Sequence, residues 1–330
     1  MDAFEDAIRL PIGTWVRGFI DFLKDYLGGL FDAVATVFTA VYDVAAWVLT
    51  TPPFWAIILV FAAVAWLVKG WKLAVGTVIG FGLVLAVDQW DSAMLTLALT
   101  VVAVLIATVI AVPLGIWAAR SQTVSSVVRP ILDFLQTMPA FVYLLPAIFL
   151  FSVGVVPGIV ATILFAVAPG VRLTELGIRG VDAEVVEAGQ AFGATPGRIL
   201  RQIQLPLALP SIMAGINQII MLSLSMSVIA SMVGAPGLGR PIVQALSSVN
   251  IPLGFEAGLA VVVIAMILDR ITGALGAPRR PRRPAAAVPG ATAPGAPDAD
   301  RAASVDLAAS VDQAASADQA ASADKTPATV

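Results

Sequence analysis

The feature that most constrains this 330-residue chain is a series of long apolar runs between residues 53 and 275. Hydrophobic residues make up 59% of the sequence and charged residues only 12%. Because such a chain has too few polar side chains to cover its apolar surface in water, it needs membrane lipid as its solvent. The sequence therefore predicts an all-helical integral membrane protein.

Hydropathy and helix-breaking residues divide this region into about seven membrane spans. Their approximate ranges are 53–68, 71–87, 92–118, 131–152, 155–170, 211–233 and 254–275. The first two are short for a hydrocarbon core of roughly 30 Å, so a hairpin that does not cross the bilayer is an alternative there.

Lys and Arg concentrate in alternate connections, which predicts that these connections face the cytoplasm. The basic residues of these connections are Lys69, Lys72, Arg120, Arg129, Arg172, Arg179, Arg198, Arg201 and Arg270. With seven spans, the N-terminus lies outside and the C-terminus inside.

Two regions flank the spans. Residues 1–50 alternate aromatic and charged positions at helical spacing, which predicts amphipathic helices on the outer membrane surface, with partial insertion as the alternative. Residues 278–330 combine a basic cluster, Arg279–Arg283, with Pro- and Ala-rich repeats, and we expect a disordered cytoplasmic tail.

A polar segment interrupts the apolar runs between residues 187 and 206. It reads Glu-Ala-Gly, three residues, Gly193, nine residues, and then Ile-x-Leu-Pro. This pattern resembles the cytoplasmic loop by which membrane subunits of bacterial ABC importers engage their ATPase subunits. The resemblance assigns ATPase docking, within a loop at 172–210, to Glu187, Ala188, Gly189, Gly193, Ala194, Thr195, Pro196, Ile203, Leu205 and Pro206.

Local chemistry predicts two short helices joined by a sharp corner in this loop. Asp182 is a candidate N-cap, and Gly193 is suited to a left-handed residue that ends the first helix. Thr195-Pro196 then starts a second helix, which we expect to stop before Leu205-Pro206. A loop of this kind without a partner is the alternative. Gly189, where many members of the resembled family have Ala, lowers helix propensity slightly.

Residues 132–144 and 210–218 resemble the glycine betaine/proline branch of these importers, and the whole resemblance covers about 69–275. It implies that residues 51–277 form a permease domain with the type I importer fold in the bacterial cytoplasmic membrane. It also implies a separate ATP-binding subunit that holds ATP and Mg, and a solute-binding protein. Because the chain has one permease domain, we expect a second copy of itself to complete the transporter.

The sequence indicates no enzyme and no cofactor within this chain. It contains neither Cys nor His, which removes thiol chemistry and the usual zinc sites. The Lys325-Thr326 pair lacks the glycines of a phosphate-binding loop. We expect no metal site and no nucleic-acid partner.

Candidates for the translocation path rest on polar and irregular positions within spans. Pro139 frees a backbone carbonyl in mid-span, which is tolerated where helices pack or line a cavity. The sixth span carries several amide and hydroxyl groups, for which hydrogen bonds between helices are the alternative role. The candidates are Gln136, Thr137, Met138, Pro139, Tyr143, Asn217, Ser223 and Ser227.

Three other functions are alternatives. A permease for another small zwitterion or amino acid fits the same motifs. An ion-coupled secondary transporter is disfavoured because the acidic residues fall at or near span ends, and such transporters commonly hold acids within spans. A membrane scaffold without transport would leave the 187–206 motif unexplained.

Overall fold

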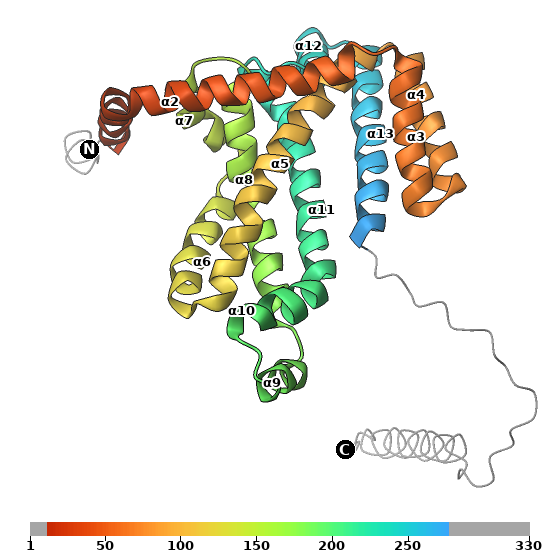
Figure 1. Cartoon of the computed structure of the whole chain (residues 1–330). Helices are drawn as coiled ribbons and strands as arrows, with labels where there is room; N and C mark the ends of the chain where they lie inside the picture. The colour runs from red at the N-terminus through yellow and green to blue at the C-terminus, as the bar shows by residue number, and fades with distance from the viewer. Residues whose placement is uncertain (1–11, 277–330) are drawn as a thin grey trace, which may run out of the picture. The chain divides into compact units, whose positions relative to one another are not determined.

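A computed structural model describes residues 12–276 of the chain. The predicted disordered tail and its basic cluster lie outside this range. Within it, every regular element is a helix. The centre of the molecule is formed by three long helices that pack along one another (Figure 1): α5 (Trp90–Arg120), α8 (Val155–Arg179) and α11 (Leu205–Ala230).

Small residues let the three central helices approach closely. A Cβ atom added to Gly115 of α5 would lie 2.6 Å from Cβ of Thr174 on α8. A Cβ atom on Gly170 of α8 would lie 2.5 Å from Cδ1 of Ile219 on α11. In lipid, where apolar side chains gain little by leaving the solvent, such close backbone packing is a main source of helix association.

Two short helices form a hairpin beside the central bundle. The helices α3 (Phe54–Lys69) and α4 (Trp71–Ala86) are separated by Gly70 alone, whose φ of 95° turns the chain back. Both pack against α13 (Ile251–Gly276). Sixteen residues of α-helix measure about 24 Å, which is less than the bilayer core.

The predicted span at 131–152 is a bent pair of helices and not one straight span. The helices α6 (Gln122–Thr137) and α7 (Ala140–Phe151) meet at an angle of 101°. Pro139 explains the bend, because a proline disfavours the helical conformation of the residue before it, and Met138 has φ −73° and ψ 136°.

The seven predicted spans therefore fall into three groups. Four correspond to α5, α8, α11 and α13, the fifth to the bent pair, and the first two to the short helices α3 and α4. By length and composition, five helices of the described region can cross a membrane, or six if the bent pair counts as one span.

The fifth of these long helices is α2 (Ile12–Thr50), which lies where two amphipathic helices were expected. It is a single 39-residue helix, because no proline occurs in this stretch and Gly28-Gly29 only weakens a helix. It runs across one end of the bundle, against α5, α7 and α8 (Figure 1). Most of its aromatic side chains are exposed, with Tyr42 as the buried exception. Because α2 is long and apolar enough to cross a membrane, its expected interfacial position stays a prediction.

The chain closes the same end of the molecule through residues 234–238, between a 3₁₀ turn (Ser231–Val233) and α12 (Gly239–Ser248). The buried backbone N–H of Leu238 donates to Oγ1 of Thr96 on α5 at 2.7 Å. Gly237 has φ +127°, and a Cβ atom there would lie 2.4 Å from the same oxygen. We call residues 234–239 the glycine clasp.

Candidate functional site

The segment between α8 and α11 protrudes from the opposite end of the bundle (Figure 1). Together with the first two residues of α11 it forms residues 180–206, which we call the corner loop. Its first helix is α9 (Ala183–Ala191), which has no buried residue. Asp182 caps it as predicted: its Oδ1 accepts from the backbone N–H of Glu184 at 3.0 Å. Glu184 lies in the first turn, where the helix dipole favours an acid.

The corner itself is a backbone motif centred on Gly193, whose φ of +75° confirms the predicted left-handed residue. The N–H of Gly193 donates to the carbonyl of Gln190 at 2.8 Å, and that of Ala194 to the carbonyl of Gly189 at 3.1 Å. These two bonds satisfy carbonyls at the end of α9 in the Schellman arrangement. The direction of the corner is therefore set by the backbone, with open space around the Gly193 Cα atom.

The second helix starts as expected but does not end as expected. Thr195 precedes α10 (Pro196–Ile199), and its carbonyl accepts from the N–H groups of Arg198 and Ile199, although its side chain makes no capping bond. The predicted stop before Leu205-Pro206 was wrong. A π-helical turn, Leu200–Gln204, joins α10 to α11 without interruption. There the N–H of Leu205 reaches back five residues, and this wider turn accommodates a proline that has no N–H.

The ten predicted docking residues divide into two groups. Gly189, Ala194, Ile203 and Leu205 are partly covered, whereas the remainder are exposed, namely Glu187, Ala188, Gly193, Thr195, Pro196 and Pro206. A Cβ atom on Gly189 would lie 2.8 Å from Cδ1 of Ile203, so the glycine lets α9 rest against the π turn. The first group thus holds the corner loop on the bundle, and the second is available to a partner.

Phe192 is a residue of the corner that the motif did not single out. It immediately precedes Gly193, and 92% of its surface is exposed. An aromatic ring this exposed, at the tip of a polar loop, buries almost none of its apolar surface against the rest of the described chain. The available signal in the sequence was an aromatic residue beside a corner glycine, flanked by small and polar residues.

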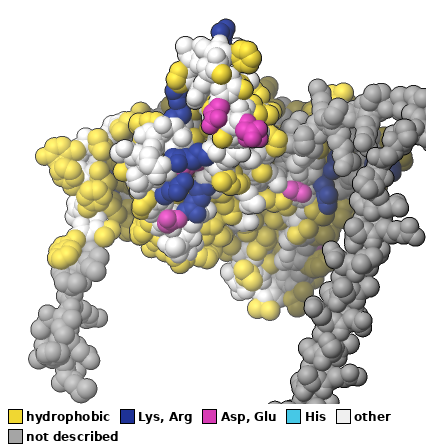
Figure 2. All heavy atoms as spheres, turned by 90° about the horizontal axis from the view of Figure 1, so that it is seen from below, with side chains coloured by type: hydrophobic (Ala, Val, Ile, Leu, Met, Phe, Trp, Pro, Cys, Tyr) yellow, Lys and Arg dark blue, Asp and Glu magenta, His cyan; other side chains and the backbone are white. Residues whose placement is uncertain are grey.

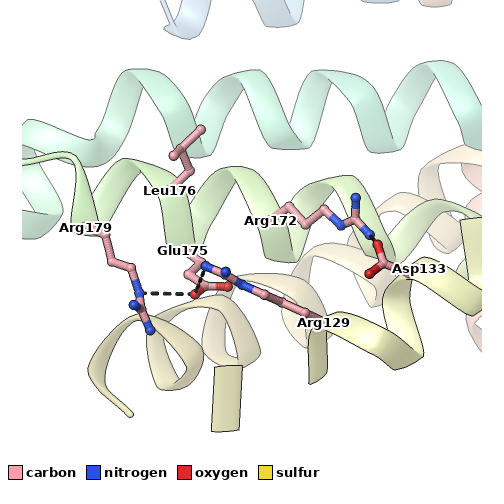
Figure 3. Close-up of a pocket in the computed structure, with 6 residues that line it drawn as sticks. All are labelled: Arg129, Asp133, Arg172, Glu175, Leu176 and Arg179. Atoms are coloured by element: carbon pink, nitrogen blue, oxygen red, sulfur yellow. Dashed lines mark hydrogen bonds and ion pairs between the residues drawn. The ribbon is translucent and has the colours of Figure 1, made fainter. Parts of the chain in front are cut away.

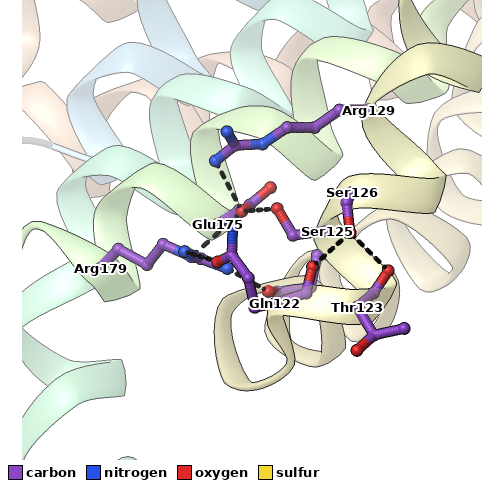
Figure 4. A network of polar contacts seen from close by, with 8 residues as sticks. Gln122, Thr123, Ser125, Ser126, Arg129, Glu175 and Arg179 are labelled. Atoms are coloured by element: carbon purple, nitrogen blue, oxygen red, sulfur yellow. Dashed lines mark hydrogen bonds and ion pairs between the residues drawn. The ribbon is translucent and has the colours of Figure 1, made fainter.

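A charged cluster lies at the base of the corner loop, between α6 and α8. Oε1 of Glu175 accepts from Oγ of Ser125 at 2.7 Å, from Nη2 of Arg129 at 2.9 Å, and lies 3.1 Å from Nε of Arg179 (Figure 4). Glu175 is only 3% exposed. Removing one partner of such a buried charge typically costs about 3–5 kcal/mol.

A second ion pair joins the same two helices nearby, between Arg172 and Asp133 (Figure 3). The two pairs line an open cavity of about 300 Å³. Figure 2, which views the molecule from this end, shows Lys and Arg side chains gathered beside acidic ones on an otherwise largely apolar surface. Unlike Glu175, the Asp133 side chain is 63% exposed, so water screens this pair.

Comparison with known proteins places the chain in a family. Residues 111–280 match the family of binding-protein-dependent transport system inner membrane components. The glycine betaine transport system permease protein OpuAB of Bacillus subtilis is 47% identical over 80% of this chain and 94% of its own length. The chain belongs to this family.

Two other permeases have similar levels of identity. The glycine betaine/carnitine transport permease protein GbuB of Listeria monocytogenes is 46% identical over 80% of this chain and 95% of its own length. The glycine betaine/proline betaine permease ProW of Escherichia coli is 42% identical over 86% of this chain and 79% of its own length.

A solved structure supports the expected type I importer fold. The inward-facing MetNI methionine ABC transporter contains a chain that matches this permease with a TM-score of 0.51 at 22% identity. That match covers 57% of this permease and 94% of the other chain. At this level of identity the likeness concerns the fold alone.

The eight candidate path residues lie on two parts of the permease, the α6–α7 bend and α11, and one apolar cluster joins the two through Tyr143 and Met226. Gln136, Thr137, Met138 and Pro139 lie at the bend between α6 and α7, where all but Met138 are exposed. Tyr143 is buried at the same bend, and its hydroxyl donates to the carbonyl of Leu135.

The candidates on α11 have other surroundings. Nδ2 of Asn217 donates to Oδ1 of Asp269 at 3.0 Å, and its Oδ1 accepts from Oγ1 of Thr272 at 2.7 Å. Asn217 thereby ties α11 to α13. Ser223 and Ser227 are buried, and the hydroxyl of Ser227 bonds within its own helix. Asn217 thus makes the interhelical hydrogen bonds of the alternative role, whereas the bond of Ser227 stays within α11. The place of all eight residues in a translocation path stays a prediction.

Proposed function

We infer that this permease imports glycine betaine or a closely related compatible solute, driven by ATP hydrolysis on a partner subunit. The observation that carries the inference is the corner loop, in which the spaced motif positions form an exposed, backbone-defined corner. The substrate rests on the three relatives above, whose names all include glycine betaine.

In the proposed mechanism, an ATP-binding subunit that carries ATP and Mg receives the corner loop. Two copies of the permease would form the pathway, with one ATP-binding subunit on each. ATP binding would draw the two corner loops together and open the pathway toward a solute-binding protein at the glycine-clasp end. ATP hydrolysis would then return the pathway to its first state, so that it opens to each side of the membrane in turn. This is alternating access.

The proposed orientation puts the corner loop in the cytoplasm of a bacterium and α2 on the outer side of the membrane. Basic side chains near the corner loop support it, since Arg129, Arg179 and Arg198 all lie toward this end. The two landmarks lie at opposite ends of the bundle, as this arrangement requires (Figure 1).

A second candidate substrate is another small zwitterion with a quaternary ammonium group. Carnitine is the specific alternative, because the name of GbuB includes it alongside glycine betaine. Proline is a further candidate substrate, because residues 132–144 and 210–218 resemble the glycine betaine/proline branch of these importers.

The test is uptake in cells that lack their own osmolyte importers. These cells would express the permease with its ATP-binding and solute-binding partners and receive labelled glycine betaine, carnitine, proline or choline. We expect glycine betaine to accumulate. Gly193→Trp should abolish uptake while membrane insertion persists, because a bulky residue is strained at this left-handed position. Uptake of another solute alone would overturn the substrate, and full uptake by the variant would overturn the docking mechanism.

A further inference from the structure

Glu175 is unusual among the charged residues of this permease. Within the described part of the chain it is the one acidic or basic side chain that is buried. It belongs to the last two turns of α8, and Arg179 ends that helix. Only residues 180–182 separate this end from α9 of the corner loop. Any force on α9 therefore reaches the turn that carries Glu175.

The partners of this carboxylate connect three helices at one point. Ser125 and Arg129 belong to α6, while Arg179 follows Glu175 by one turn on α8. Arg179 continues the network: its Nη1 donates to Oε1 of Gln122 at 2.9 Å, and its Nη2 donates to the carbonyl of Ala118 on α5 at 2.8 Å (Figure 4). We call these residues the α8 clamp: Ala118, Gln122, Ser125, Arg129, Glu175 and Arg179.

The other end of α6 is the bend at Met138-Pro139. Across this bend the buried Tyr143 hydroxyl of α7 bonds to the carbonyl of Leu135 on α6. A shift of α6 is thus passed on to α7, and it also moves the exposed polar side chains of Gln136 and Thr137. The helix α6 therefore has the α8 clamp near its first residues and the bend at its last.

We propose that Glu175 is a positioning residue that couples the corner loop to the α6–α7 bend, so that movement of α9 is converted into movement at the bend. This proposal rests on the proposed function of the corner loop as the ATPase contact. The proposed coupling depends on both the charge and the burial of the Glu175 carboxylate. Two hydrogen bonds and an ion pair converge on one oxygen of a largely buried carboxylate, so separating α6 from α8 would break the contacts from Ser125 and Arg129 and leave only the one from Arg179 on the same helix.

The exposed Arg172–Asp133 pair provides a matched control, because it joins the same two helices. If any ion pair between α6 and α8 sufficed, both pairs would contribute equally. Because Asp133 is largely exposed and Glu175 is buried, the proposal assigns the coupling to Glu175.

The first experiment reconstitutes the permease with its ATP-binding and solute-binding partners in proteoliposomes. It measures solute transported per ATP hydrolysed. Glu175→Gln keeps the size of the side chain and its bond with Ser125 but removes the charge. We expect this variant to bind the ATP-binding subunit and hydrolyse ATP, while transport per ATP falls about tenfold. Asp133→Asn should transport with the wild-type ratio, and Glu175→Asp should recover part of the loss.

A Glu175→Gln complex that assembles and keeps the wild-type ratio would overturn the proposal. A wild-type permease that fails to bind the ATP-binding subunit would instead overturn the proposed function, so the two failures are distinguishable.

A second measurement decides the question if Glu175→Gln does not assemble. The permease contains no Cys, so Ser126→Cys on α6 and Val185→Cys on α9 would be the only labelling sites in each copy of this chain, and the partner subunits would be used in Cys-free form. The proposal expects the distance between the labels to stay constant between the nucleotide-free complex and the complex trapped with ATP and vanadate. A change in that distance would show that α6 does not follow α9, and would overturn the coupling.

Discussion

The two ends of the bundle are closed in different ways. The glycine clasp is uncharged, and its backbone packs directly against Thr96, with no room for a Cβ atom at Gly237. The corner loop is exposed at its tip and rests on the bundle through partly covered residues such as Gly189 and Ile203, and the charged α8 clamp lies at its base. The clasp depends on shape and tolerates little change in volume. The corner loop depends on backbone direction and on charge, which leaves its outer surface free for a partner.

The largest effect on stability should come from the clasp. Gly237→Ala adds a Cβ atom 2.4 Å from Oγ1 of Thr96 at a residue with φ +127°. The clash and the backbone strain should together cost about 3 kcal/mol or more. Thermal unfolding of the purified permease in detergent would measure this, with Gly258→Ala, which has open space, as the control. Equal melting temperatures would show that the clasp is looser than described.

The next effect should appear in partner binding and not in stability. Phe192→Ala removes a ring that packs on nothing within the permease but is available to the ATP-binding subunit. If the ring fills a pocket there, the affinity should fall roughly thirtyfold, which corresponds to about 2 kcal/mol. A titration of ATP-binding subunit onto immobilised permease would detect this. Phe192→Tyr, which keeps the ring, should bind nearly as well, and unchanged binding of Phe192→Ala would place the contact elsewhere.

A smaller effect separates backbone conformation from volume within the corner loop. Gly193 and Gly197 both have open space around Cα, but only Gly193 has a positive φ. Gly193→Ala should lower stability of the corner by about 1–2 kcal/mol, whereas Gly197→Ala in a helix should be neutral or slightly stabilising. Hydrogen exchange at the N–H groups of Gly193 and Ala194 would report the difference. Equal protection in both variants would contradict the left-handed corner.

The smallest effect concerns C-terminal residues that belong to neither the glycine clasp nor the corner loop. Deleting residues 285–330 should leave solute uptake unchanged, because the match to the transport family ends at residue 280. Uptake assays of the shortened and full-length permease, at equal expression, would measure this. A loss of uptake would assign the tail a role in transport.

Sequence reasoning succeeded where the structure is decided by neighbours along the chain. The Asp182 cap and the Gly193 corner follow from residues only a few positions apart, and both were predicted. The continuity of α2 was missed, because the aromatic and charged spacing of this region predicts amphipathic helices without showing whether they join into one. The π turn before Pro206 was missed because proline usually marks a helix start.

Contacts between distant residues were beyond the sequence. Glu175 was recognised only as an acid near a span end, since Ser125 and Arg129 lie 50 and 46 positions away. The different surroundings of the path candidates have the same cause. Asn217 faces α13 and the residues near Pro139 do not, which depends on how α6 and α11 are arranged and not on their own composition.

The connection between α8 and α9 consists of Gly180, Val181 and Asp182. A tether of three residues spans at most about 10 Å when fully extended, and Asp182 is already committed to capping α9. Such a link limits how far the start of α9 can move from the end of α8. A displacement of α9 by a partner would then be passed to the end of α8 through a short connection and not absorbed by a long flexible one.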